Sequence, residues 1–200
     1  MRTLVFILLA ILNFQVAVFA QETDEDKTER RSGLIYLKGE DSPYTGLVKE
    51  YFESGKVRVT KNVKNGLLDG TYAEYFENGK TKYQGSFTAG KLNGQFTMFY
   101  TNGQKEYSGS MANGKKQGKY FGWFENGQPS FEGTYKADKK HGAWAEWYVN
   151  GQKGMEGKYK KGNPVGNITY WDESGEKTSY KPSKKDEKLL KKIENMNNPK

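Results

Sequence analysis

The sequence contains no cysteine and one histidine. Without cysteine the chain can form no disulfide, no thiolate metal site and no lipid attachment at a signal-peptide cysteine. A lone histidine, His141, cannot assemble the zinc or nucleophile constellations that enzymes use. The glycine-rich segments also lack the Gly-Lys-Ser/Thr ending of phosphate-binding loops. We therefore expect a protein that is not an enzyme and that holds no metal and no cofactor.

Long hydrophobic runs are lacking after residue 20. Residues 1–20 contain one basic residue, Arg2, then an apolar stretch that ends at Ala20 with small residues where an export peptidase cleaves. An uncleaved anchor is the alternative, but Asn13 and Gln15 interrupt the apolar stretch and the segment after it is acidic. We expect cleavage near Ala20, no transmembrane segment in the mature chain, and export to a periplasm, a cell surface or the medium.

Basic residues are in excess, but they are unevenly placed. The formal net charge is +8, and the last twenty residues hold seven lysines against three acids. A nucleic-acid groove would instead string lysine and arginine along the folded face, between stacking aromatics. We therefore expect no nucleic-acid partner.

Glycine and aromatic residues are abundant, and they recur with a period of 24 residues. One glycine column is Gly55, Gly79, Gly103, Gly127, Gly151 and Gly175; a second is Gly46, Gly70, Gly94, Gly118, Gly142 and Gly166; a third includes Gly85, Gly109 and Gly133. A fixed period of this length indicates a repeat array, in which each unit needs its neighbours to bury its apolar face.

Each unit is predicted to be a β-hairpin centred on a two-residue turn. In the unit from Gly70 to Asn93 the turn is Asn78-Gly79, the sequence favoured by a type I′ turn. Cross-strand partners then have residue numbers that sum to 157. The expected pairs are Gly70 with Phe87, Tyr72 with Gly85, Glu74 with Tyr83 and Phe76 with Thr81. Two glycines would thus each lie under an aromatic ring that covers bare backbone.

The connection between hairpins is predicted to be a loop of about six residues, such as residues 88–93. Short connections place consecutive hairpins side by side. The fold class is therefore expected to be all-β: an elongated, single-layer antiparallel meander of about six hairpins over residues 33–180. Residues 21–32 are expected to be a flexible polar leader, and Gly33 to Lys38 a leading strand. Residues 181–200 are expected to be a Lys-rich tail with a short amphipathic helix that caps the last hairpin.

One aromatic column has the wrong alternation for the apolar face. Its members are Tyr51, Tyr75, Phe99, Trp123, Trp147 and Trp171. Two explanations are open: a β-bulge turns these rings inward, or they form a stripe on the polar face. In the second case Tyr75, Phe99, Trp123, Trp147 and Trp171 are a candidate binding face that could stack on a sugar or an extended peptide.

The string Tyr83-x-Gly85-x-Phe87-x-x-Gly90-x-x-x-Gly94 resembles the MORN repeat. The standard motif has a further glycine two positions later, where this chain has Phe96. The chain is therefore similar to the bacterial MORN-variant class, whose members are often labelled antitoxin-like. The resemblance implies an elongated hairpin array used for recognition or scaffolding, without a catalytic site.

Two kinds of binding function remain open. The first is an exported scaffold that binds an unidentified protein partner or a second copy of itself. The second is a carbohydrate or cell-wall binder. An antitoxin-like role is a further alternative, but an antitoxin would meet its toxin in the cytosol, which fits poorly with export.

Overall fold

The computed structural model describes residues 21–178. Its elements are β1 (Glu22–Asp24), the 3-10 helix η1 (Glu25–Lys27), β2 (Thr28–Arg31), β3 (Leu34–Leu37), β4 (Gly46–Tyr51), β5 (Val57–Lys64), β6 (Leu67–Tyr75), β7 (Thr81–Thr88), β8 (Lys91–Phe99), β9 (Lys105–Ala112), β10 (Lys115–Trp123), β11 (Pro129–Lys136), β12 (Lys139–Trp147), β13 (Lys153–Lys160), β14 (Asn163–Trp171) and β15 (Lys177–Thr178). The predicted signal peptide and the predicted C-terminal helix lie outside the described residues.

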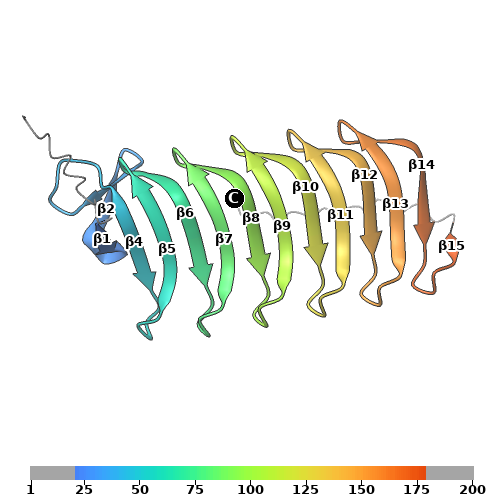
Figure 1. Ribbon diagram of the computed structural model, residues 1–200, viewed down its shortest axis with the longest axis horizontal. Coiled ribbons are helices and arrows are strands. Elements are labelled where there is room, and N and C mark those ends of the chain that lie inside the picture. Colours follow the sequence, from blue (N-terminus) through green and yellow to red (C-terminus); the bar gives the residue numbers. More distant parts are fainter. Residues whose placement is uncertain (1–20, 179–200) are drawn as a thin grey trace, which may run out of the picture.

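The strands form one long row, as the sequence predicts (Figure 1). Thirteen strands share a single sheet in the order β1-β4-β5 and then consecutively to β15. From β4 onward every neighbouring pair is antiparallel, so the array is an all-β, single-layer meander of hairpins. Within residues 21–178 no helix is long and apolar enough to cross a membrane.

The predicted register of the hairpin β6–β7 is confirmed for most of its length. Gly70 pairs with Phe87, Tyr72 with Gly85 and Glu74 with Tyr83. The expected pair of Phe76 with Thr81 is wrong, because the register shifts after Glu74 and Thr81 pairs with Tyr75. The extra residue of this β-bulge is therefore on β7.

The sequence predicted a two-residue turn within each hairpin and a longer loop between hairpins, and the structure shows the opposite arrangement. In the hairpin turn, the Phe76 N–H donates to the Lys80 carbonyl at 2.8 Å and the Gly79 N–H donates to the Phe76 carbonyl at 2.8 Å. This is a three-residue loop in which Gly79 has a positive φ of 81° and Asn78 does not. The tight two-residue turn lies between hairpins instead: Thr88 pairs directly with Lys91, so no six-residue loop exists. Ala89 and Gly90 both have positive φ there, as a type I′ turn requires.

The asparagine of each hairpin turn is explained by hydrogen bonds rather than by its φ angle. Asn102 Oδ1 accepts from the Gln104 N–H at 2.8 Å, and Asn102 Nδ2 donates to the Glu125 carbonyl in the next turn at 3.0 Å. The same bridge to the following turn is made by Asn78, Asn126 and Asn150. The turn asparagines thus tie consecutive hairpins together along one side of the sheet.

The glycine columns have two different roles. A Cβ added at Gly109 would overlap the ring of Tyr120, and one at Gly133 would overlap the ring of Trp144. Both rings come from the following hairpin, whereas the sequence predicted cover from the paired strand of the same hairpin. In the second column, apart from Gly46, which lies against Tyr44 and Gln21, an added Cβ would meet no ring: it would meet open space at Gly118, Gly142 and Gly166, and the Asn62 side chain at Gly70. These residues all have positive φ. That column serves backbone conformation, so the prediction of a covering ring is wrong there.

The N-terminal segment is not a flexible leader. β1 pairs in parallel with β4, and Lys49 Nζ lies 2.6 Å from Glu22 Oε1 across this pair. The predicted leading strand at Gly33 to Lys38 instead forms β3, which pairs with β2 in a separate two-stranded ribbon. Ile35 of β3 is buried in a small cluster with Tyr44, Val48 and Val63. The N-terminal residues therefore cover the first edge and the first end of the apolar face.

The last hairpin turn forms its side-chain hydrogen bonds within the turn. Asp172 stands where the other turns have an aromatic residue, and its Oδ1 accepts from the Ser174 hydroxyl at 2.6 Å and from the Ser174 and Glu176 N–H groups at 3.0 Å. These bonds, the Ser174 hydroxyl first, lower the pKa of the Asp172 carboxyl. The turn needs no following hairpin to satisfy its donors.

The inter-hairpin packing predicts the effect of a branched side chain at Gly109. We expect Gly109→Val to lower the free energy of unfolding by about 1–3 kcal/mol or more, because overpacking forces the Tyr120 ring away from its site. Urea unfolding followed by circular dichroism measures this. His141→Ala, a half-buried site in the same sheet, is the control. Equal losses in the two variants would contradict the packing described here.

The asparagine bridges make a second prediction. Asn102→Asp keeps the acceptor for the Gln104 N–H but loses the donor to the Glu125 carbonyl, and Asn102→Ala loses both. We expect Asn102→Ala to destabilise the array by about 1–2 kcal/mol, with Asn102→Asp in between. Thermal or urea unfolding of the three proteins tests the ranking. Equal stability of the three proteins would count against the bridge.

Candidate binding faces

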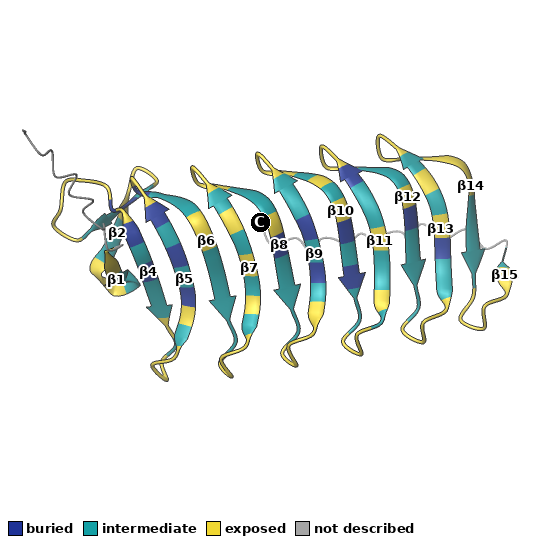
Figure 2. Ribbon diagram, in the orientation of Figure 1, coloured by how far each residue is buried: buried dark blue, intermediate teal, exposed yellow. Residues whose placement is uncertain are grey.

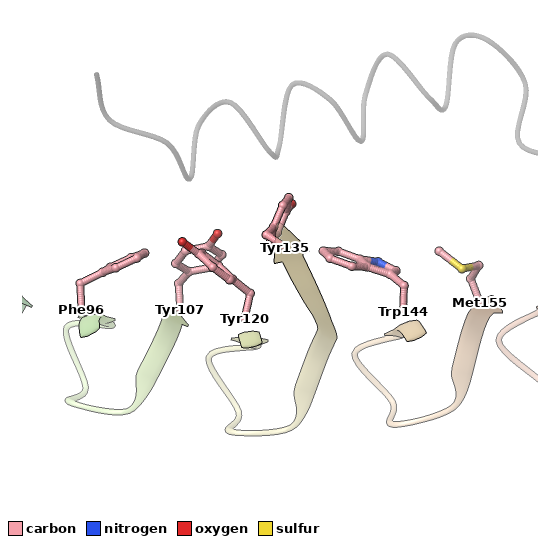
Figure 3. Close-up of a cluster of buried hydrophobic side chains, with 6 residues drawn as sticks. All are labelled: Phe96, Tyr107, Tyr120, Tyr135, Trp144 and Met155. Carbon is pink, nitrogen blue, oxygen red and sulfur yellow. The ribbon is translucent and has the colours of Figure 1, made fainter. Parts of the chain in front are cut away.

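One face of the sheet carries a continuous row of aromatic side chains, which we call the ring face. Its buried members are Phe96, Tyr107, Tyr120, Tyr135, Trp144 and Met155, with Tyr83, Leu92, Met98, Met111, Phe131, Tyr159, Ile168 and Tyr170 packed against them. The buried positions run across the middle strands in Figure 2, and Figure 3 shows the six side chains projecting from the same face. This is the predicted apolar face of the array.

The rings of this face contact one another from strand to strand. Tyr120 is fully buried, with its ring centroid 4.8 Å from that of Tyr135 and 5.7 Å from that of Tyr107. Phe131 and Trp144 stack almost parallel, with centroids 5.4 Å apart. Offset and edge-to-face pairs of this kind add stability beyond the area they bury. The ring contacts continue from Tyr72 to Tyr159, so they link β6 to β13.

Charged groups on the ring face are paired with the rings. Lys140 Nζ lies 3.9 Å from the centroid of the Trp144 ring, and Lys116 Nζ lies 4.9 Å from that of Tyr135. The Trp144 Nε1 donates to Glu146 Oε1 at 2.7 Å, and the Tyr72 hydroxyl donates to Glu74 Oε1 at 2.7 Å. On the ring face, lysine ammonium groups therefore lie over the aromatic rings and form cation–π contacts with them.

Burial raises the pKa of several tyrosines on the ring face. Burial, followed by the negative charge of Glu74, raises the pKa of Tyr83 to about 12. The pKa values of Tyr72 and Tyr120 are also raised, in both cases mainly by burial. The phenols therefore remain neutral and act as packed rings and hydrogen-bond donors at ordinary pH.

The second aromatic column, Tyr51, Tyr75, Phe99, Trp123, Trp147 and Trp171, is called the turn column. It lies on the opposite, polar face. Trp123 and Phe121 have the same parity on β10, opposite to Tyr120, and their rings stack with centroids 5.9 Å apart. A register shift does precede Trp123, but the extra residue is Ser130 on the partner strand. A β-bulge is therefore present, as the first of the two explanations required. It does not rotate the rings of the turn column toward the ring face.

The rings of the turn column are neither fully buried nor fully exposed. Trp123, Trp147 and Trp171 are half-buried, while Tyr51 at the start of the row is 41% exposed. Lysines flank two of them: the Nζ atoms of Lys105 and Lys153 lie 5.8 Å from the ring centroids of Trp123 and Trp171. The sequence predicted these rings as a candidate binding face, and the structure places them in one column near the hairpin turns.

A second set of contacts fixes the backbone of this column. The Tyr100 hydroxyl donates to the Trp123 carbonyl at 2.7 Å, and the Tyr148 hydroxyl donates to the Trp171 carbonyl at 3.0 Å. Each tyrosine comes from the preceding hairpin, so these bonds hold neighbouring rings at a fixed separation. That separation is two strands, or about 9.6 Å.

A row of mostly polar side chains, interrupted by Ala73, Phe121 and Ala145, runs beside the turn column on the same face. Register pairs connect them across the sheet in the order Thr60, Ala73, Gln84, Thr97, Ser108, Phe121, Glu132, Ala145, Glu156 and Thr169. The sequence predicts that this face is polar, but the continuous row becomes visible only in the structure. Hydroxyl, amide and carboxylate groups next to spaced rings are suited to a flat, hydroxyl-bearing or peptide ligand.

The position of the single histidine also has a structural explanation. In its column, Asp69 Oδ2, Asn93 Oδ1 and Gln117 Oε1 accept a backbone N–H from the next tight turn between hairpins. His141 is half-buried at the equivalent place. The column is therefore a structural one. In residues 21–178 no group of three or more His, Cys, Asp or Glu side chains is arranged to hold a metal ion.

These features define a class of protein: a tandem array of β-hairpin repeats with an aromatic ring face and a polar face. The family model described as the MORN repeat variant matches residues 44–65, 68–89, 92–113 and 116–137. These four units are MORN repeat variants. Each match covers one hairpin with its turn, and the hairpins that follow repeat the same geometry.

Other comparisons add little. No curated protein matches the sequence. Among solved structures, the chain is similar to an S. aureus TarM mutant in complex with fondaparinux, α-GlcNAc-glycerol and UDP, at 12% sequence identity and a TM-score of 0.24. The match covers 71% of this chain and 22% of that one, so this chain spans under a quarter of the solved structure's length.

The acidity of Tyr83 predicts how stability depends on pH. Because its pKa is raised from 10.0 to about 12 in the folded protein, the neutral phenol favours folding up to about pH 10. This contribution is lost as the pH rises from about 10 to 12. We expect Tyr83→Phe to lose less stability than the wild type between pH 7 and pH 11.5. Urea unfolding of both proteins at each pH tests this, and identical pH dependence would contradict it.

Proposed function

We propose that this protein is an exported, non-catalytic binding module that acts as a scaffold for a partner protein. The observation that carries the proposal is the polar face, where one ring recurs every second strand beside a row of mostly polar side chains. Hydrogen bonds from Tyr100 and Tyr148 fix the backbone under two of these rings. A surface that is ordered before binding loses little entropy on association.

The arrangement suits an extended or repetitive partner surface. Half-buried tryptophans provide large contact areas with few rotatable bonds, and such residues carry much of the binding energy at protein interfaces. Lys105 and Lys153 beside two of the rings would favour a partner with acidic groups at a matching spacing. Export is supported by the pattern of residues 1–20, and the absence of a catalytic role by the single histidine and the lack of cysteine.

A carbohydrate is the second candidate ligand. The spacing of the turn column favours it, because a polymer with a regular turn could offer the same sugar face to each ring in succession. The neighbouring polar side chains, such as Gln84, Thr97 and Ser108, would then bond to sugar hydroxyls. Of the two, the protein partner is our conclusion, since stacking on a sugar needs an open ring face and the tryptophans of this column are half-buried.

An affinity experiment tests the proposal. The mature chain, Trp123→Ala/Trp147→Ala and the control Val149→Ala are used as baits on extracts of the native envelope. Val149 is exposed near the same turns. We expect a protein retained by the wild type and the control to be lost from the double variant, since two rings leave the contact.

A second arm separates the two ligands. The same three proteins are sedimented with insoluble cell-wall glycan that has been stripped of protein. Glycan binding that requires Trp123 and Trp147, without a retained protein, would replace the scaffold by the carbohydrate binder. A retained protein that binds all three baits equally would show that the turn column is not the binding face.

A further inference from the structure

Asparagine followed by glycine occurs at seven places in the part of the chain that the structure describes. The asparagines are Asn65, Asn78, Asn93, Asn102, Asn113, Asn126 and Asn150. In this dipeptide the backbone nitrogen of the glycine can attack the side-chain amide carbon of the asparagine, because glycine has no Cβ to block the approach. In a folded protein the reaction is slowed where hydrogen bonds hold the glycine N–H or the asparagine amide. The hydrogen bonds at the seven sites therefore decide which of them is reactive.

Four of these sites lie in hairpin turns, where both reacting groups are held. At Asn102, Oδ1 accepts from the Gln104 N–H and Nδ2 donates to the Glu125 carbonyl. The Gly103 N–H donates to the Tyr100 carbonyl at 2.8 Å. The same three bonds occur in the turns of Asn78, Asn126 and Asn150. These four asparagines are therefore protected from attack.

The side chain of Asn93, which follows the tight turn between β7 and β8, is bonded at both ends. Its Oδ1 accepts from the Asn113 N–H at 3.3 Å, and its Nδ2 donates to the Thr88 hydroxyl at 3.4 Å. Asn93 is also half-buried. This amide is therefore held as well.

The tight turn between β5 and β6 is covered by the N-terminal ribbon. Asn65 is exposed, but Gly66 is buried and donates its N–H to the Tyr44 carbonyl at 2.8 Å. A Cβ placed on Gly66 would lie 2.8 Å from the Leu34 Cβ, so the ribbon packs directly on this glycine. The attacking nitrogen of this site is therefore both bonded and buried.

The tight turn between β9 and β10 holds its asparagine and glycine least. Asn113 and Gly114 are both exposed, and the Asn113 side chain makes no hydrogen bond to any residue between 21 and 178. The Gly114 N–H donates to the Leu92 carbonyl at 3.3 Å, whereas the corresponding distances at the other tight turns are 2.8 to 3.1 Å. A Cβ added at Gly114 would meet no atom of the described residues within 4 Å. At this site neither reacting group is firmly held.

We propose that Asn113 is a site of spontaneous modification, where the protein loses a side-chain amide with water as the co-reactant. The Gly114 N–H gives its proton to solvent, and the nitrogen forms a bond to Cγ of Asn113. The bond from Cγ to Nδ2 breaks and ammonia leaves, which closes a cyclic succinimide. Water then opens the ring at either carbonyl, so residue 113 becomes aspartate or isoaspartate. No atom is oxidised or reduced.

The product alters the turn in charge and in length. A carboxylate replaces a neutral amide beside the exposed Lys115, and the isoaspartate form adds one carbon to the main chain. Ala112 pairs directly with Lys115, so the turn between them holds two residues. The tight turns and the hairpin turns lie along opposite long sides of the sheet (Figure 1), so the inference does not depend on a partner at the turn column.

Peptide mapping of the aged protein tests the site. The folded protein is kept in mildly alkaline buffer, and samples taken over time are digested in acid and analysed by mass spectrometry, where the product is heavier by about 1 Da. We expect Asn113 to react about tenfold or more faster than Asn65, in the same type of turn, and than Asn102, whose amide is bonded at both ends. The same protein in concentrated urea is the control, and there the seven rates are expected to converge.

Two outcomes of the mapping would overturn the proposal. The first is a folded protein in which Asn65 or Asn102 reacts as fast as Asn113, or in which Asn113 does not react while the urea sample does. The second is a preference for Asn113 that persists unchanged in urea, since the neighbouring sequence and not the turn would then be its cause.

An Asn113→Gln variant gives a measurement on the whole protein. Glutamine keeps the amide, but its longer side chain forms a cyclic imide far more slowly. We expect the acidic form that accumulates in the wild type on isoelectric focusing to be greatly reduced in this variant. Circular dichroism confirms that the variant keeps its strands, and equal accumulation in the two proteins would contradict the assignment to Asn113.

Discussion

The contact that the array depends on is the one between bare backbone in one hairpin and a ring from the next. At Gly109 and Gly133 no Cβ could be accommodated, because the rings of Tyr120 and Trp144 occupy that space. Such a contact cannot form within an isolated hairpin. Each unit is therefore stable only in the presence of its neighbour, which is the physical reason for a repeat array rather than a set of independent ribbons.

Hydrogen bonds at both sides of the sheet reinforce the same dependence. On one side, the turn asparagines donate to carbonyls of the following turn. On the other, backbone N–H groups of the tight turns donate to the preceding hairpin, as Gly90 does to the Leu68 carbonyl at 2.8 Å. Packing in the middle and hydrogen bonds at the edges thus act in the same direction, and they keep the spacing of surface groups constant along the row.

Much of the architecture could be predicted because it depends on periodicity. The fixed period of the glycines gave the number and order of the hairpins, and alternation gave the pairs of Tyr72 with Gly85 and Glu74 with Tyr83. The turns could not be predicted correctly from propensity. Asn78-Gly79 suits a type I′ turn, but here Asn78 is used for its side-chain bonds to two turns. Ala89, a residue with no preference for positive φ, occupies the tight turn with a φ of 47°.

Contacts between segments that are far apart in the sequence also could not be predicted. The acidic composition of residues 21–32 is typical of a solvated leader, yet parallel pairing with β4 and an ion pair between Glu25 and Lys61 at 2.6 Å hold this segment in place. For the candidate binding face, the alternation of Trp123 indicated the polar side correctly. The half-buried state of its ring depends on Phe121, Lys105 and the bulge at Ser130, which no single-sequence pattern specifies.

The self-contained turn at Asp172 has a consequence for how such an array can lengthen. Interior turns extend an amide or a phenol toward the unit ahead, whereas the Asp172 carboxylate is occupied by Ser174 and Glu176 of its own turn. A copy inserted between interior units would meet matching groups on both sides. One added after this turn would meet no such amide or phenol, so the contacts that join one hairpin to the next favour insertion within the row over addition after Asp172.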